Sequence, residues 1–152
     1  MLLLNSALRQ MNNKLSRDID LEVNDITVEQ LSLLIALWKK EGISQQDLGE
    51  YVDKDRPSVT RLLDNMERGN LVVRITSEQD RRVRLIYLTK KGKDLQVKLV
   101  KVAEAAVKKS LQNINSEMLS SFVTVAEMIK ENILQEQNED KSKKQISGRG
   151  KR

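Results

Sequence analysis

The feature that most constrains the fold is an ordered run of start and stop signals between Ile26 and Leu95. Three short helices are predicted there, each opened by a small polar or acidic residue that can accept a hydrogen bond from the first turn: Thr27, Ser44 and Asp55. Two β-rich runs follow, at 71–75 and 83–88, and a polar tip separates them. The second and third helices form a helix-turn-helix pattern, and the hairpin is its wing.

Local chemistry supports these boundaries. Thr27 has Gln30 three residues later, which is the capping-box pattern, and Gly42 is expected to end this first helix. Asp55 precedes Pro57, a residue that a helix tolerates only in its first turn. A helix is therefore expected to begin at this point and to turn its apolar residues inward.

Amphipathic helices flank the central part. Apolar residues recur at helical spacing over the first twenty residues, again from residue 93 over about six turns, and in a last helix that Asn115 or Ser116 can cap. The fold class predicted is mainly α with a small β-hairpin wing. Within a single chain, 1–136, residues 26–92 form a winged-helix lobe, and the helices at 1–20 and 93–136 carry apolar faces. A second subunit best buries these faces, although a monomeric bundle would bury them too.

The last segment, 137–152, is basic and nearly devoid of apolar residues. Its composition predicts a disordered tail. Its lysines and arginines could attract phosphate, or they could simply be solvated.

Composition excludes several classes of function. The chain of 152 residues has no Cys and no His, which removes disulfides, thiolate chemistry, imidazole catalysis and most transition-metal sites. Its carboxylates are scattered, with no nucleophile paired to them, so we expect no catalytic residues, no metal and no cofactor. No segment is apolar and long enough for a signal peptide or a membrane span, which favours a soluble cytoplasmic protein. The net charge of +5 permits a polyanionic partner.

The helix that begins after Asp55 carries the first candidate binding residues. Its N-terminal half presents residues that avoid the apolar stripe, namely Arg56, Pro57, Ser58, Thr60 and Arg61. In helix-turn-helix proteins this part of the second helix meets base edges in the major groove. Arginine can bind guanine through two hydrogen bonds, and serine or threonine is short enough to allow close approach. A solvated helix face is the alternative interpretation.

The hairpin tip carries the second set. Arg81 and Arg82 are placed where a side chain can reach the minor groove, whose negative potential attracts arginine. Asp80 would repel phosphate unless it is paired, so we predict that it bonds Arg74 or Arg82 and braces the wing. An exposed charged turn is the alternative here.

These motifs together resemble the MarR family of bacterial winged-helix transcription regulators, over residues 31–92. The matching residues lie in register along the lobe: Glu29-Gln30-Leu31, Asp47-Leu48, Ser58-Val59-Thr60-Arg61, Leu63-Asp64, Glu67, Leu71-Val72, Arg74, Asp80-Arg81-Arg82, Leu88-Thr89 and Gly92. The resemblance implies a homodimer formed through the terminal helices, two lobes that read a pseudo-palindromic operator, and in many members a crevice for a small-molecule effector.

Two features bear on that resemblance. The family has glycine directly before the Leu-Val that starts the wing, where this chain has Asn70, the non-glycine residue that best tolerates left-handed backbone geometry. Trp38 and Phe122 could line an effector pocket, but aromatics at apolar helical positions are more often core, and no effector-binding residue is predicted. Because this chain has no Cys and no His, it cannot sense peroxide through a thiol or bind zinc through histidine, as some members of the family do.

The resulting expectation is a regulator that binds double-stranded DNA as a homodimer and could be released by a small-molecule effector. It is expected to repress by occluding a promoter, although occupancy at another position could activate. The alternative is a winged helix that docks on an acidic protein surface without reading DNA sequence. A docking module has no need for a small, polar face at residues 58–61, which favours the regulator.

Overall fold

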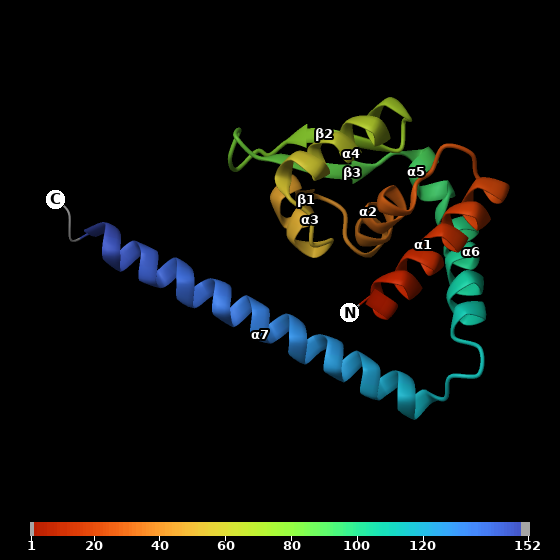
Figure 1. The fold of residues 1–152 in the computed structure, drawn as a ribbon. Coiled ribbons are helices and arrows are strands. Elements are labelled where there is room, and N and C mark those ends of the chain that lie inside the picture. The colour runs from red at the N-terminus through yellow and green to blue at the C-terminus, as the bar shows by residue number, and fades with distance from the viewer. Residues whose placement is uncertain (1, 150–152) are drawn as a thin grey trace. The chain divides into compact units, whose positions relative to one another are not determined.

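The computed structural model describes the backbone of residues 2–149 and the side chains of residues 2–136. In chain order, its elements are α1 (Leu2–Glu22), α2 (Val28–Lys39), β1 (Ile43–Ser44), α3 (Gln45–Tyr51), α4 (Arg56–Arg68), β2 (Val72–Thr76), β3 (Arg84–Leu88), α5 (Lys90–Asp94), α6 (Gln96–Ser110) and α7 (Ser116–Arg149) (Figure 1). The chain divides into two compact units, Met1–Ser110 and Leu111–Arg152. The predicted fold class, mainly α with a small β wing, is confirmed.

The helices of the lobe begin where their capping residues predict. The Thr27 hydroxyl accepts from the Gln30 amide at 3.2 Å while the Gln30 side chain accepts from the Thr27 amide at 2.9 Å, a complete capping box. Ser44 caps α3 by accepting from the Asp47 amide at 3.1 Å. Asp55 caps α4, and Pro57 lies in the first turn of that helix. These contacts are local in sequence, which is why sequence patterns can predict them.

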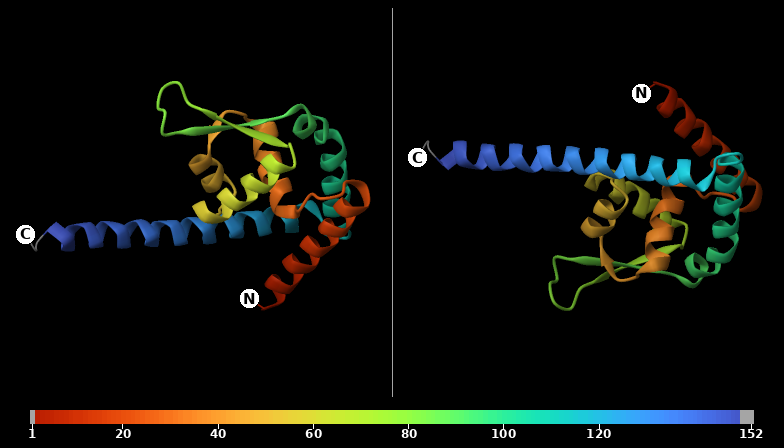
Figure 2. Two further views of the ribbon diagram at one scale, coloured as in Figure 1. Left: turned by 90° about the horizontal axis from the view of Figure 1, so that it is seen from above. Right: turned by 90° about the horizontal axis from the view of Figure 1, so that it is seen from below.

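The sheet has three antiparallel strands in the order β1-β3-β2. The predicted hairpin is β2 and β3, with Val73 opposite Tyr87, and its loop extends beyond the strands (Figure 2). The third strand, β1, pairs Ile43 with Ile86 and was not predicted, because two residues are too few for an alternating pattern. Asn70 has φ +56, so it takes the left-handed conformation expected before the wing.

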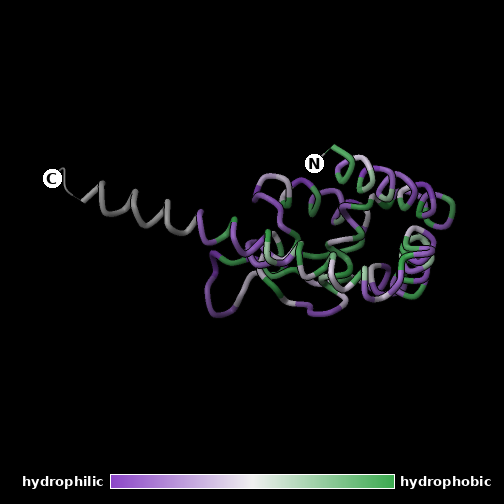
Figure 3. Tube along the Cα trace, turned by 60° about the horizontal axis from the view of Figure 1, so that its bottom comes forward, coloured by the Kyte–Doolittle hydropathy of each residue, from purple (hydrophilic) through white to green (hydrophobic). Residues whose placement is uncertain are grey.

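The core lies between the helices and the inner face of the sheet. Fully buried residues come from α2, α3, α4 and β3: Leu33, Leu34, Leu37, Leu48, Val59, Leu63, Met66 and Ile86. Ile19 of α1 and Leu99 of α6 are also fully buried and belong to the same cluster. Part of the apolar surface of the terminal helices is thus buried within the chain's own first unit. The N-terminal end of α1, green in Figure 3, leaves Leu2 and Leu3 exposed.

The segment after the wing differs in detail from the single long helix expected there. It forms α5 and α6, separated at Leu95, whose backbone remains in the right-handed helical region (φ −71, ψ −18). Among the described helices, none is long and apolar enough to cross a membrane.

The last helix, α7, begins at Ser116 and is capped by Asn115, which accepts from the Met118 amide at 2.8 Å, as predicted. It continues to Arg149, so residues 137–149 are helical where their composition predicted a disordered tail. Glutamate, glutamine, lysine and arginine recur in this segment, and they are good helix formers despite their polarity. The basic side chains from residue 137 onward lie outside the described residues.

A partly exposed ion pair joins Glu41, in the loop between α2 and β1, to Lys93 of α5. The Glu41 carboxylate is 2.9 Å from the Lys93 ammonium and accepts from the Leu88 amide at 3.1 Å. The hydrogen bond from Lys93 lowers the pKa of Glu41, and the Leu88 amide adds to that effect. Because the folded-state pKa is lowered, this contact stabilises the fold at neutral pH, and its contribution is lost as the pH falls through that pKa.

Candidate nucleic-acid interface

The N-terminal half of α4 holds all five residues predicted to form its binding face. Arg56, Pro57 and Arg61 are exposed, whereas Ser58 and Thr60 are partly buried. The Ser58 amide donates to the Asp55 carboxylate at 2.7 Å. Hydrogen bonds from the hydroxyl and the amide of Ser58 lower the pKa of Asp55, so this cap stays ionised and fixes the first turn of α4.

The Thr60 hydroxyl already makes two hydrogen bonds within the protein. Its hydroxyl donates to the Arg56 carbonyl at 2.8 Å and accepts from the side-chain amide of Gln45 at 2.6 Å. Gln45 is the first residue of α3, so this bond links the two helices of the helix-turn-helix.

The wing tip is a closed loop held by its own hydrogen bonds. The Ser77 hydroxyl accepts from the amides of Gln79 and Asp80, and the Asp80 carboxylate accepts from the Arg82 amide at 2.9 Å. Arg81 and Arg82 have exposed side chains. Of the two predicted partners of Asp80, the structure has Arg82, bonded through its main chain.

Arg74 braces the wing against α4 instead of bonding Asp80. Its guanidinium lies 2.7 Å from the carboxylates of both Asp64 and Glu67 and donates to the Thr60 carbonyl at 3.3 Å. Its side chain is 17% exposed, which makes it the most buried member of this cluster. Of the two predicted alternatives, the pairing of Asp80 with Arg74 is therefore wrong. Asp64 and Glu67, three residues apart on α4, both bond the Arg74 guanidinium and so outcompete the single carboxylate at the tip.

A hollow of about 410 Å³ lies between α3, the start of α4 and residues 82–84 at the tip end of the wing. Its lining is Ser44, Gln45, Gln46, Gly49, Glu50, Lys54, Arg56, Arg82, Val83 and Arg84. Four of these residues are cationic and one is acidic. Within residues 2–136, the ion pairs include none of the arginines at 56, 61, 81, 82 and 84. The hollow can therefore receive negatively charged groups without breaking an internal contact.

Sequence patterns did not single out Lys54, Arg84 or Gln45 as site residues. Arg84 begins β3 only two residues after Arg82, and its side chain is exposed, so its closeness to the wing tip could have marked it as a site residue. That signal was available from the sequence. The position of Gln45 against α4 depends on how two helices pack, and no local pattern encodes it.

The Arg74 contacts give a testable prediction. Arg74→Ala is expected to lower the free energy of unfolding by roughly 1–2 kcal/mol, because it removes a partly buried cation that bonds two carboxylates and a carbonyl on α4. The carboxylates are about half exposed, which keeps the effect below that of a fully buried pair. Urea denaturation measures the change, and Arg84→Ala is the matched control because Arg84 is an exposed arginine on the neighbouring strand. Equal stability of the two variants would contradict the bracing role.

Comparison of the sequence with known families gives a match to the MarR family over residues 26–83. Among curated proteins, the HTH-type transcriptional regulator YdgJ of Bacillus subtilis is 32% identical over 108 residues, which is 71% of this chain. The match spans 66% of that relative's length, just under two thirds. YdgJ is itself uncharacterised beyond that description.

Solved structures agree on the fold. A protein of unknown function from Listeria innocua is 31% identical and superimposes with a TM-score of 0.64, covering 85% of this chain and 88% of that one. The MarR family transcriptional regulator Sco3205 of Streptomyces coelicolor, solved in complex with DNA, is 17% identical with a TM-score of 0.78, covering 84% of this chain and 81% of its own. YdgJ and Sco3205 are both described as transcriptional regulators.

Proposed function

Because this chain belongs to the MarR family, we propose that it is a sequence-specific DNA-binding regulator of transcription that acts as a homodimer on a pseudo-palindromic operator. Occupation of the operator would repress transcription wherever it overlaps a promoter. A relative of the same fold was solved in complex with DNA, which supports double-stranded DNA as the partner.

The observation that carries this proposal is the basic hollow between α3, α4 and the wing. The hollow is lined by Arg56 of α4 and Arg84 of β3, by Lys54 of the loop between α3 and α4, and by Arg82 of the wing loop. A phosphodiester backbone carries one negative charge per nucleotide, so cations at several points along a groove fit it better than they fit a single small anion. A DNA strand seated here would place the outer face of α4 in the adjacent major groove.

The proposed roles divide between the two elements. Arg56, Pro57, Ser58, Thr60 and Arg61 belong to the face of α4 that enters the major groove, and Arg61 is exposed and free to reach a guanine edge. At the tip, Arg81 and Arg82 extend toward the minor groove, with Arg82 supported from behind by Asp80.

The proposed dimer rests on α7. Its apolar stripe at positions 118, 122, 125, 129 and 133 consists of Met118, Phe122, Val125, Ile129 and Ile133, and each of these side chains is about half exposed in the single chain. A row of large apolar residues along one helix face is a surface that a second copy of the chain can bury. Phe122, whose apolar position at helical spacing favoured a core residue, belongs to this stripe and is exposed in the single chain.

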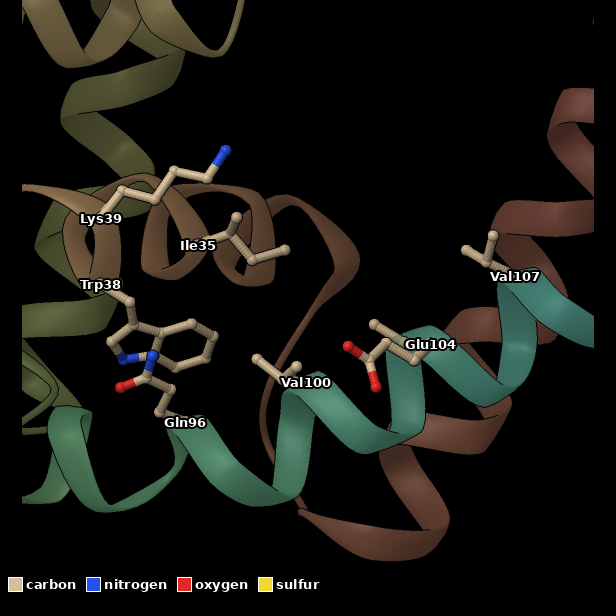
Figure 4. A pocket seen from close by; sticks show the side chains of 8 residues that line it. Ile35, Trp38, Lys39, Gln96, Val100, Glu104 and Val107 are labelled. Carbon is tan, nitrogen blue, oxygen red and sulfur yellow. The ribbon is translucent and has the colours of Figure 1, made fainter. Parts of the chain in front are cut away.

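The proposed site for a small-molecule effector is a second hollow, of about 420 Å³, between α2 and α6 (Figure 4). Ile35, Trp38 and Val100 form its apolar wall, while Lys39 and Glu104 also line it. The Trp38 indole donates to the Gly92 carbonyl at 3.0 Å, which holds the ring in place. Trp38 therefore packs against the core and also borders the hollow. A mostly apolar molecule with one charged group matches this lining.

Two arginine variants test the DNA-binding surface. Arg61→Ala is expected to weaken the binding free energy for the best operator by about 1–3 kcal/mol and to relax the preference at particular base pairs, because the lost contact is to a base. Arg82→Ala is expected to weaken binding on all sequences and to reduce its salt dependence, because the lost contact is to the backbone or the narrow groove.

Both variants are compared by titrating the same labelled duplexes at two salt concentrations. Arg68→Ala is the matched control, since Arg68 is an exposed arginine in the last turn of the same helix. If Arg61→Ala and Arg82→Ala bind as tightly as the unmodified protein, these roles are wrong.

A further inference from the structure

One side chain outside the predicted binding face lies against that face. Gln45 begins α3, yet its amide nitrogen is 2.6 Å from the hydroxyl oxygen of Thr60 on α4. The amide group therefore sits beside the part of α4 that would meet DNA. Gln45 also lines the basic hollow, together with Arg56 and Arg82.

The hydrogen bonds fix which way this amide points. The Thr60 hydroxyl has one proton, and it is donated to the Arg56 carbonyl at 2.8 Å. Toward Gln45 the hydroxyl can then only accept, so the nitrogen of the amide faces Thr60 and its oxygen points away. A flipped amide would place two acceptors against each other.

This arrangement removes Thr60 from direct base reading. Its only donor is already used by a main-chain carbonyl of its own helix, and one of its acceptor positions is used by Gln45. The Gln45 amide, in contrast, keeps one N–H and its carbonyl oxygen available. A donor beside an acceptor is the pattern with which glutamine binds adenine at N7 and N6 in the major groove.

We propose that Gln45, and not Thr60, reads a base of the operator, at an A·T pair in each half-site, with Thr60 holding the Gln45 amide against α4. This inference rests on the proposed function, since it requires that α4 enters the major groove. In it, Gln45 is a specificity-determining residue supplied by the first helix of the motif, and Thr60 is a positioning residue.

The test compares base preferences. The unmodified protein, Gln45→Met and Thr60→Val are each titrated against a panel of duplexes in which every base pair of the selected operator is changed in turn. Methionine keeps the unbranched shape of glutamine without its amide, and valine keeps the shape of threonine without its hydroxyl. Thermal unfolding of each variant checks that the lobe is intact.

Gln45→Met is expected to bind the best operator roughly 10- to 100-fold more weakly and to become indifferent at one A·T pair per half-site. Thr60→Val is expected to lose part of the preference at that same pair, and the double variant to be no weaker than Gln45→Met alone. A residue with only a structural role would lower affinity by the same factor on every duplex.

Gln10→Met is the matched control. Gln10 is an exposed glutamine of α1 that does not line the basic hollow, and its amide bonds the Ser6 hydroxyl of the same helix at 3.4 Å. It is expected to leave every base preference unchanged.

Two outcomes would overturn the inference. Unchanged preference at every pair in Gln45→Met would show that Gln45 reads no base, and loss at different pairs in Gln45→Met and Thr60→Val would show that Thr60 reads a base by itself. Either result leaves the proposed function intact if the unmodified protein discriminates among duplexes. An unmodified protein with no preference at all would contradict the proposed function, and the inference with it.

Discussion

Gly92→Ala is expected to destabilise the lobe by about 2–4 kcal/mol, a large share of the stability of a domain of this size. A Cβ at residue 92 would lie 2.2 Å from the carbonyl oxygen of Leu71 and 3.1 Å from the side chain of Leu88. The first of these is main chain and cannot swing aside. It also accepts the Thr89 amide at 3.0 Å, so any movement that relieves the clash weakens a hydrogen bond that closes the end of the hairpin.

Gly69→Ala is the matched control for this substitution. Gly69 ends α4 with φ −74, and a Cβ there would meet nothing closer than 3.4 Å. It is expected to change the free energy of unfolding by less than about 1 kcal/mol. Urea denaturation of both variants measures the difference. If Gly92→Ala is as stable as Gly69→Ala, the packing of α5 against the start of β2 has been misjudged.

Ile129→Asp is expected to yield a monomer and to weaken operator binding by at least about 100-fold. Ile129 is in the middle of the apolar stripe of α7 and is 54% exposed in the single chain. The free energy needed to bury an aspartate at a subunit interface would exceed the free energy that burial of this part of the stripe contributes to association, because the charge has no partner among apolar residues. Two lobes that are no longer joined lose the advantage of binding both half-sites together, which is worth about 10² to 10⁴ in affinity.

Thr124→Asp introduces the same residue on the opposite face of α7 and serves as the control. The Thr124 hydroxyl donates to the Ser120 carbonyl of the same helix at 3.1 Å. This variant is expected to remain a dimer and to bind the operator as the unmodified protein does. Sedimentation velocity gives the oligomeric state of each variant. A dimeric Ile129→Asp would contradict the assignment of this stripe to the interface.

The elements that sequence patterns predicted are those that depend on neighbours along the chain. Thr27, Ser44 and Asp55 each accept a hydrogen bond from an amide three residues later, so their helices could be located from spacing alone. The hairpin could be predicted from two β-rich runs separated by a polar tip. The left-handed backbone of Asn70 could be predicted because asparagine tolerates a positive φ.

The features that sequence patterns missed depend on contacts between elements. Arg74 bonds two carboxylates of α4, Gln45 reaches Thr60 across fifteen positions, and β1 exists only through its pairing with β3. A residue type tells what a side chain can bond, but which partner it meets is set by how helices and strands pack. For the candidate interface, sequence patterns singled out Arg56, Arg61, Arg81 and Arg82, whereas Lys54 and Arg84 were found only from how the elements pack around the hollow.

Selection of bound sequences from a random duplex pool, with the purified full chain at two salt concentrations, shows whether the chain reads DNA sequence as a dimer. We expect enrichment of an inverted repeat whose half-sites lie about one helical turn, roughly 10 bp, apart, with weaker recovery at the higher salt. Salt-sensitive retention without an enriched motif, or no retention at low salt, would show that the chain is not a dimeric reader of DNA sequence, and the second result would favour a winged helix that docks on protein.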